Sequence, residues 1–177
     1  GKPFFGQIQL RGGKHSCPVQ TNKDNVTVPP YYPDTPLVRA TIAHHYDTIR
    51  RTDDEVKRIL AALDRDGLTG ETAVFFFSDH GYGMHRHKQF LYEGGVRVPM
   101  LIAGPEISAG VRGDLISGID LAATALALAG APRPARMQGQ DVFADDFGRS
   151  FVVSARDRCD YTIDRVRALV TERFRYI

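Results

Sequence analysis

Two residues with ligand chemistry follow a strongly hydrophobic run. The run from Ala73 to Phe77 predicts a buried strand, and Asp79 and His80 stand where that strand would leave its sheet. Open α/β sheets bind ligands just outside the ends of their strands. Adjacent residues of a regular strand point to opposite faces, so Asp79 and His80 can hold one metal ion only where the chain turns, as Gly81 permits. A helix cap or a hydrogen-bonded pair at a strand end is the alternative for these residues alone.

A cation and a double glycine follow shortly afterwards. Lys88 precedes the segment Tyr92 to Pro99, which contains two adjacent glycines and predicts a turn before a second strand. We expect carboxylate, imidazole and ammonium groups to converge on one small volume. A preorganised cation in a dry site lowers a reaction barrier by on the order of 3 kcal/mol, whereas the alternative for Lys88 is an exposed surface lysine. His85 and His87 lie in the same loop and either contact the substrate or are ordinary exposed histidines.

The order of these motifs resembles a known enzyme family. Ser-Asp-His-Gly at 78–81, then Lys88, then Tyr-Glu-Gly-Gly-x-Arg-x-Pro at 92–99 are similar to the second half of the sulfatase catalytic domain, within the alkaline-phosphatase-like superfamily of metal-dependent hydrolases. The resemblance covers nearly the whole chain, which corresponds to only part of such an enzyme. Further segments that carry it are 2–5, 30–36 and 119–122, while 137–141, 155–158 and 173–177 resemble the branch that includes heparan N-sulfatases.

The resemblance implies a role for each candidate residue. Asp79 and His80 would be metal ligands, and Lys88 would hold a sulfate oxygen and stabilise charge in the transition state. His15 would be the general acid that protonates the leaving group, a role worth roughly 10²–10⁴-fold in rate. Because the spacing that leads to His15 is one residue longer than the family pattern, Lys14 competes for that position. Lys14, His85 and His87 are the expected substrate contacts.

The resemblance also implies a divalent metal and a formylglycine. Ca²⁺ is the metal that the family favours, but calcium prefers oxygen donors and many sulfatases carry Asn where this chain has His80, so Mg²⁺, Mn²⁺ and Zn²⁺ are alternatives. Sulfatases make formylglycine from the Cys or Ser of a Cys/Ser-x-Pro-x-Arg segment, and neither Cys17 nor Cys159 lies in one. We therefore expect the nucleophile and two acidic metal ligands upstream, and we expect residues 1–177 alone to be inactive. The two cysteines could form one disulfide.

The sequence thus predicts a fragment of a metal- and formylglycine-dependent sulfatase that hydrolyses sulfate esters or sulfamates of carbohydrates. The alternatives are a phosphomonoester or phosphonate-ester hydrolase of the same superfamily and a non-catalytic relative that binds sulfated glycans. Twenty-three basic against 21 acidic residues argue against nucleic acid or a membrane as partner. The expected partners are a sulfated carbohydrate and the missing N-terminal part of the same protein. A periplasmic, secreted or lysosomal-type location rests on the resemblance alone.

The expected fold is α/β, with a mixed sheet flanked by helices as in alkaline phosphatase and a small C-terminal antiparallel strand region. Residues 1–140 would belong to the catalytic domain and residues 141–177 would begin a smaller strand-rich subdomain. Helices are expected from Pro36 to about residue 65 and from a capping box at Ser117–Asp120 to Gly130. Strands are expected at 4–10, 73–78, 99–103, 149–155 and 166–177.

Several charged residues are expected to be structural. Asp53 falls inside the apolar stripe of the long helix, where an acid usually needs a hydrogen-bond partner. Glu93 and Arg97 would support the double-glycine turn, in which the glycines allow close backbone approach. The segment Arg156 to Arg158 predicts a cluster of salt bridges. The stripe itself consists of Ile42, Tyr46, Ile49, Val56, Leu60 and Leu63.

Overall fold

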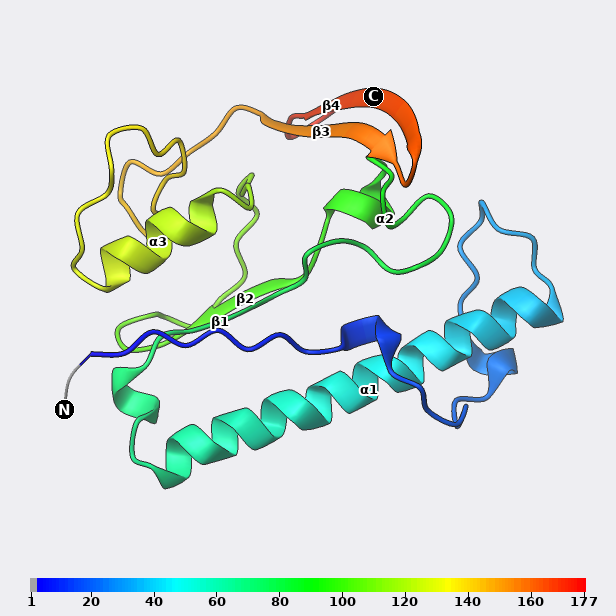
Figure 1. The fold of residues 1–177 in the computed structure, drawn as a ribbon, viewed down its shortest axis with the longest axis horizontal. Helices are drawn as coiled ribbons and strands as arrows, with labels where there is room; N and C mark the ends of the chain where they lie inside the picture. The colour runs from blue at the N-terminus through cyan, green and yellow to red at the C-terminus, as the bar shows by residue number, and fades with distance from the viewer. Residues whose placement is uncertain (1–2) are drawn as a thin grey trace. The chain divides into compact units, whose positions relative to one another are not determined.

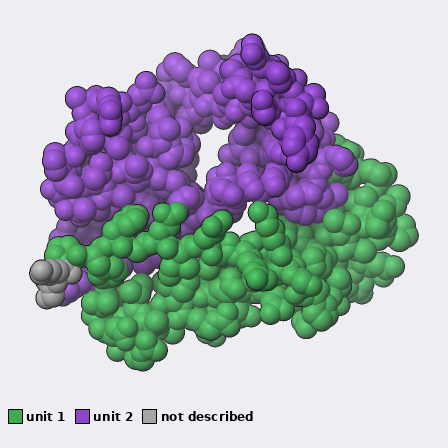
Figure 2. Space-filling view, in the orientation of Figure 1, with its two compact units in different colours: residues 1–70 green, residues 71–177 purple. Residues whose placement is uncertain are grey.

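The computed structural model describes residues 3–177, which fall into two compact units, Gly1–Gly70 and Glu71–Ile177 (Figure 2). Both helical and strand elements are present, as expected for an α/β protein. The domain boundary predicted after residue 140 stays a prediction. Within the part of the chain that the structure describes, no helix combines the length and the apolar character needed to cross a bilayer.

The first unit is built on one long helix, α1, which spans Pro36–Arg65 (Figure 1). Its start is fixed by Thr35, whose hydroxyl oxygen accepts a hydrogen bond from the backbone N–H of Val38 at 3.3 Å, and by proline at the first position. Its end is fixed by Gly67, whose φ of +69° suits glycine. These local signals confirm the predicted helix. Two short 3₁₀ helices, η1 (Gly12–Lys14) and η2 (Lys23–Asn25), pack against it.

The packed face of α1 coincides only in part with the predicted apolar stripe, of which Ile42 is buried. Its buried acid is Asp47, which accepts hydrogen bonds from the backbone N–H groups of Gln20 (2.7 Å) and Thr21 (3.0 Å). Asp53 is exposed, so the expectation that it packs and needs a partner is wrong. Tyr46 also lies exposed on the stripe, as do Ile49 and Leu60. The apolar periodicity identified one face of the helix. The loop before α1 packs on another face, where Asp47 accepts hydrogen bonds from the backbone N–H groups of that loop.

The predicted strand at residues 4–10 is wrong. The segment Pro3–Leu10 has no ladder partner among the described residues, and Phe4, Phe5 and Ile8 are exposed. Alternation of side chains supplies the two faces of a strand, but a strand also needs a neighbour that takes up its backbone hydrogen bonds.

The first part of the second unit contains a short antiparallel ladder of two strands, followed by a helix. Strand β1 (Val74–Phe77) pairs with β2 (Met100–Ala103), with Phe77 opposite Met100, which confirms both predicted strands. Between them lies the four-residue helix α2 (Glu93–Val96), and the 3₁₀ helix η3 (Thr69–Glu71) precedes β1. Helix α3 spans Asp120–Leu128 and ends before Gly130, whose φ is +64°. It starts later than Ser117, because only the acidic half of the expected capping box forms: Asp120 accepts from the backbone N–H of Ser117 at 2.9 Å.

The C-terminal region is an antiparallel sheet in the order β3–β4–β5, which spans Val152–Cys159, Thr162–Val170 and Arg175–Tyr176. The strand predicted at 149–155 is confirmed as β3, which continues through the charged residues to a tight turn at Asp160, whose φ is +50°. The single strand predicted at 166–177 is wrong, because this range contains the end of β4 and all of β5, which pair with each other. The charges are tolerated because they pair between strands. Arg156 forms a salt bridge with Asp164, and Arg167 bonds Asp157 at 2.6 Å. The predicted salt-bridge cluster is thus confirmed for Arg156 and Asp157.

Candidate functional site

The turn after β1 brings Asp79 and His80 together. The ladder extends one residue beyond β1, because the N–H of Ser78 donates to the carbonyl of Pro99 at 3.2 Å. The chain then turns, and the Ser78 hydroxyl donates to the carbonyl oxygen of His80 at 2.7 Å. In this turn Oδ2 of Asp79 lies 3.4 Å from Nε2 of His80. Adjacent side chains therefore converge, as sharing one ion would require.

The hydrogen bonding of His80 leaves one ring nitrogen available as a ligand. Nδ1 lies 2.6 Å from the carbonyl oxygen of Gly81, and because that oxygen only accepts, Nδ1 carries the proton. In the neutral ring Nε2 then has a lone pair that faces the Asp79 carboxylate, which is 75% exposed. Imidazole oriented through its second nitrogen and an accessible carboxylate fit a divalent metal. No set of three or more His, Cys, Asp or Glu side chains within residues 3–177 is arranged to hold an ion, and metal binding by Asp79 and His80 stays a prediction.

Lys88 lies in a loop whose end is hydrogen-bonded to its beginning. The N–H of Lys88 donates to the carbonyl of Tyr82 at 3.0 Å, and the N–H of Gly81 donates to the carbonyl of Gly95 at 3.2 Å. The backbone of Lys88 is therefore held beside a residue only two positions beyond His80, with the lysine half-buried. The structure thus places the backbone of Lys88 next to the turn that carries the predicted metal ligands.

Close backbone approach makes glycine necessary at this turn. A Cβ on Gly81 would lie 1.8 Å from the carbonyl oxygen of Gly94, and a Cβ on Gly95 would lie 1.9 Å from that of Phe90. Real Cβ atoms do not approach so closely, so the prediction that the glycines permit close approach is confirmed. The expected Glu93–Arg97 pair also forms, at 3.1 Å.

The two loop histidines differ in their surroundings. His87 packs edge-on against the ring of Tyr82, with 5.2 Å between ring centroids, and a Cβ on Gly94 would lie 2.5 Å from its ring atoms. Burial lowers the pKa of His87 below its ordinary value, and a hydrogen bond with the backbone of Gly94 opposes this shift. The packed ring is therefore neutral at pH 7. His85 is exposed on the same loop, and substrate contact by either residue stays a prediction.

Lys14 and His15 belong to the first unit, where they have opposite environments. Lys14 ends η1 and is exposed. His15 is only 8% exposed, and its Nε2 lies 3.4 Å from Oε2 of Glu55 on α1. Glu55 can therefore orient the imidazole, while Lys14 presents its ammonium to solvent. The roles predicted for both residues stay predictions.

Sequence reasoning missed the residues of the C-terminal sheet that hold the loop around Lys88. Arg175 of β5 donates to the carbonyl of Leu91 at 3.2 Å and forms an ion pair with Glu93. Arg156 of β3 donates to the carbonyl of Gln89 at 2.6 Å. The sequence assigned Arg156 only to a salt-bridge cluster and did not indicate these contacts, because the partners of both arginines lie 67 to 84 residues away in the sequence. A disulfide between Cys17 and Cys159 was a possibility that the sequence left open, and the structure does not form it.

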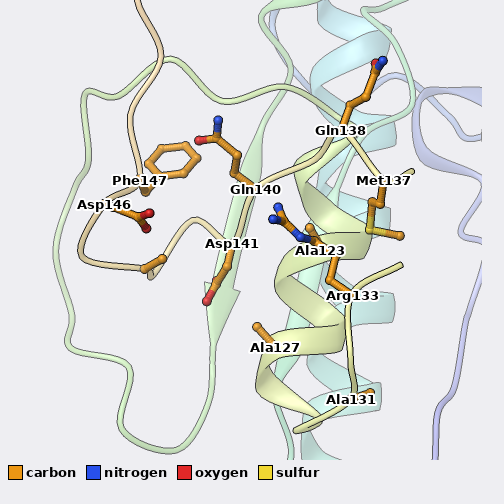
Figure 3. A pocket seen from close by; sticks show the side chains of 11 residues that line it. Ala123, Ala127, Ala131, Arg133, Met137, Gln138, Gln140, Asp141, Asp146 and Phe147 are labelled. Atoms are coloured by element: carbon orange, nitrogen blue, oxygen red, sulfur yellow. The ribbon is translucent and has the colours of Figure 1, made fainter. Parts of the chain in front are cut away.

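A separate cavity of about 520 Å³ lies beside α3 (Figure 3). Ala123 and Ala127 of the helix form one wall, while Asp141, Asp146 and Phe147 face them from the loop that follows. None of the predicted site residues lines this cavity. The catalytic candidates of the second unit are therefore at the β1 turn and not in this space.

Comparisons with known proteins agree on one family. The protein-family profile described as Sulfatase matches residues 1–131. An ulvan-active sulfatase from Formosa agariphila is 36% identical over 172 residues, which cover 94% of this chain and 29% of that protein. Arylsulfatase K from Xenopus laevis is 37% identical over 107 residues, 58% of this chain and 20% of that protein. An extracellular sulfatase SULF-1 homolog from Drosophila melanogaster is 37% identical over 54% of this chain and 9% of its own length.

A solved structure shares the fold. It is described as BT4656 in complex with its substrate D-glucosamine-2-N,6-O-disulfate, and it superposes with a TM-score of 0.59 at 22% identity, over 78% of this chain and 31% of that one. The α/β architecture predicted for this chain is thus confirmed. The chain spans less than a third of the length of these relatives.

Proposed function

Because the chain belongs to the sulfatase family, we propose that it is part of an enzyme that hydrolyses sulfate esters or sulfamates of carbohydrates. The observation that carries the proposal is the convergence of Asp79 and His80 at the end of β1, with the backbone of Lys88 held against the same turn. A divalent metal held by an acidic ligand and an imidazole, together with a cationic lysine, would suit a tetrahedral anion. The activity is that of the full-length protein, of which this chain is a part.

In this proposal Lys88 supplies fixed positive charge to the sulfate oxygens. Its backbone is held by a hydrogen bond to the carbonyl of Tyr82, so the point from which the side chain starts is fixed before the substrate arrives. Such preorganisation stabilises charge that increases in the transition state and typically contributes 10²–10³-fold to kcat. The glycines of the same turn allow the close backbone approach of Gly81 to Gly94 and of Gly95 to Phe90.

Asp79 and His80 would hold a divalent metal, with Ca²⁺ as the family expectation and Mg²⁺, Mn²⁺ or Zn²⁺ as alternatives. A bound cation would neutralise charge on the sulfate oxygens. The Asp79 carboxylate suits all four ions, whereas imidazole suits Zn²⁺ better than Ca²⁺. The nucleophile, a formylglycine in the family, would come from a segment outside residues 1–177.

The leaving alcohol or amine needs a proton, and His15 and Lys14 are the two candidates for its donor. A substrate with a good leaving group, such as an aryl sulfate, depends little on a general acid, whereas a sugar sulfate depends on it strongly. His15→Asn and Lys14→Ala in the full-length enzyme therefore discriminate between them. Loss confined to the sugar sulfate identifies the donor, and equal loss on both substrates identifies a residue needed for binding or folding.

The substrate class and the location are parts of the same proposal. The ulvan-active relative and the disulfated glucosamine bound in the solved structure support a sulfated carbohydrate as substrate. Relatives named as extracellular sulfatases support a location outside the cytoplasm. Fractionation of cells that produce the full-length protein tests the location.

The decisive experiment compares sulfate and phosphate hydrolysis by the full-length enzyme. We expect turnover of sulfated glucosamine or ulvan oligosaccharides, a 10²–10³-fold loss of kcat in Lys88→Ala, and no change in the exposed-lysine control Lys57→Ala. Asp79→Asn and His80→Ala should each lower the content of bound divalent metal. Preference for phosphate monoesters would indicate the phosphohydrolase instead. Glycan binding without turnover, unaffected by chelation, would indicate the non-catalytic relative.

Residues 1–177 alone are expected to be inactive, because the chain lacks a formylglycine segment. Hydrolysis by this purified chain that disappears in Lys88→Ala would contradict that expectation.

A further inference from the structure

We propose that the β3–β4 hairpin positions Lys88 by clamping the next residue, Gln89. The catalytic value of Lys88 rests on the proposed function, but the clamp is a property of the second unit that can be tested separately. Figure 1 shows the end of β3 beside the segment that leads into α2. The contacts between them join residues about 70 positions apart in the sequence.

The first component of the clamp holds the side chain of Gln89. Its Nε2 donates to Oδ1 of Asp160 at 2.6 Å, and its Oε1 accepts from the Cys159 thiol at 3.6 Å. Both the nitrogen and the oxygen of the side-chain amide therefore form hydrogen bonds at the turn of the hairpin. Asp160 is itself in the left-handed region, with φ of +50°, a conformation that Asp and Asn tolerate better than most residues.

The second component holds the backbone of Gln89. Nη1 of Arg156 donates to the carbonyl oxygen of Gln89 at 2.6 Å, and the guanidinium lies 5.0 Å from the centroid of the Phe90 ring. Arg156 is only 12% exposed and is braced by its salt bridge with Asp164 on β4. A buried, stacked and paired guanidinium has little freedom to move, so the carbonyl that it binds is fixed as well.

The clamp explains an unusual backbone conformation. Gln89 has φ of +68°, which is uncommon for a residue with a side chain and persists only where the surroundings determine it. On the other side of Lys88, its own N–H is bonded to Tyr82. The backbone on both sides of Lys88 is thus held by hydrogen bonds. Those before it come from the loop itself, and those after it, at Gln89, come from the hairpin.

Gln89, Arg156 and Asp160 are therefore positioning residues that act through Lys88. Release of the clamp should lower kcat because the cation is less well oriented in the transition state, whereas KM for the sulfated substrate should change little. A purely structural role would instead lower the amount of folded enzyme or change both constants.

The test reverses the hydrogen bond in the full-length enzyme. Gln89→Glu places two carboxylates against each other and should lower kcat about tenfold. Asp160→Asn retains an acceptor oxygen and should retain most activity. Combined with Gln89→Glu, it offers an amide donor to the new carboxylate and should restore kcat. Asp157→Asn, on an exposed pair of the same strand, is the matched control and should leave kcat unchanged.

Two further measurements separate the clamp from the proposed function. In a Lys88→Ala background, Gln89→Glu should cause no additional loss of kcat, because its effect passes through the lysine. Hydrogen exchange of the amides at 84–91 should become faster in Gln89→Glu and return to normal in the double variant, whether or not the enzyme hydrolyses sulfate. A wild-type enzyme without sulfatase activity would overturn the proposed function alone. Failure of the double variant to restore protection, or an additive loss in the Lys88→Ala background, would overturn the positioning role.

Discussion

Removal of the Asp120 carboxylate should destabilise the second unit more than any exposed ion-pair substitution. Asp120 is 0% exposed, and its two oxygens accept from the backbone N–H groups of Ser117 (2.9 Å) and Gln140 (2.8 Å). The same carboxylate bonds the guanidinium of Arg149, whose Nε lies 3.1 Å away. This one side chain thus joins the start of α3 to two points in the loop that follows it.

The magnitude follows from what Asp120→Ala leaves behind. Arg149 is only 16% exposed and would keep a charge with no partner, which costs about 3–5 kcal/mol when one half of a buried pair is removed. The two orphaned N–H groups would add to this cost only in part, because water can enter the space. Each 1.4 kcal/mol is a factor of ten, so opening of this region should become roughly 10²- to 4 × 10³-fold more frequent.

The assay is hydrogen exchange at the amide of Gln140, together with urea unfolding of the full-length protein. Asp114→Asn is the control, because Asp114 pairs with Arg112 at 2.7 Å on the surface, and its loss should cost less than about 1 kcal/mol. Asp120→Ala with Arg149→Met should recover part of the loss, because the unpaired charge is gone. The reasoning is refuted if Asp120→Ala costs no more than Asp114→Asn, or if the second substitution worsens the first.

Three further predictions concern the helix cap and the titrating groups. Thr35→Ala should cost about 1 kcal/mol through loss of the α1 cap, measured as a lower urea midpoint, whereas the exposed Thr41→Ala should cost less. Hydrogen bonds from the backbone and hydroxyl of Thr21 lower the pKa of Asp47, so its stabilisation is present above about pH 4 and is lost as pH falls through the folded-state value. The difference in stability between wild type and Asp47→Asn should accordingly shrink on acidification, and a constant difference from pH 7 to pH 3 would contradict this. Gly94→Ala should displace the ring of His87 and return its pKa, followed by NMR, towards the ordinary value; an unchanged pKa would show that burial against Gly94 is not the cause.

The parts of the fold that local interactions specify were predictable. Helix α1 begins at a threonine cap followed by proline and ends at a glycine with positive φ, and all three signals lie within a few residues of the helix. The hydrophobic runs that became β1 and β2 were equally clear. The strand expected at 4–10 was wrong because that prediction depended on a distant neighbour. The alternation of apolar and polar side chains was present, but no described residues form a ladder with this segment.

The candidate site also has features that the sequence predicted and features that it could not predict. The order of Asp79, His80 and Lys88 with the double glycine was enough to indicate the family and the chemistry, because these residues must be close in sequence to share one turn and one loop. The convergence of the first two side chains required a turn at the strand end, and the structure has that turn. The burial of His15 against Glu55 could not be predicted, because it depends on which face of α1 its loop packs against.

The sequence by itself determined the motifs, the boundaries of α1 and the family, since these depend on residue type and on hydrogen bonds that span a few positions. Only the tertiary structure decided how the loop around Lys88 is held. The partners of Gln89 lie 67 to 71 residues further along the chain, and no local preference encodes such a pairing. Contacts of that kind form because folding brings together two segments that are distant in the sequence, and their polar groups then form hydrogen bonds with each other.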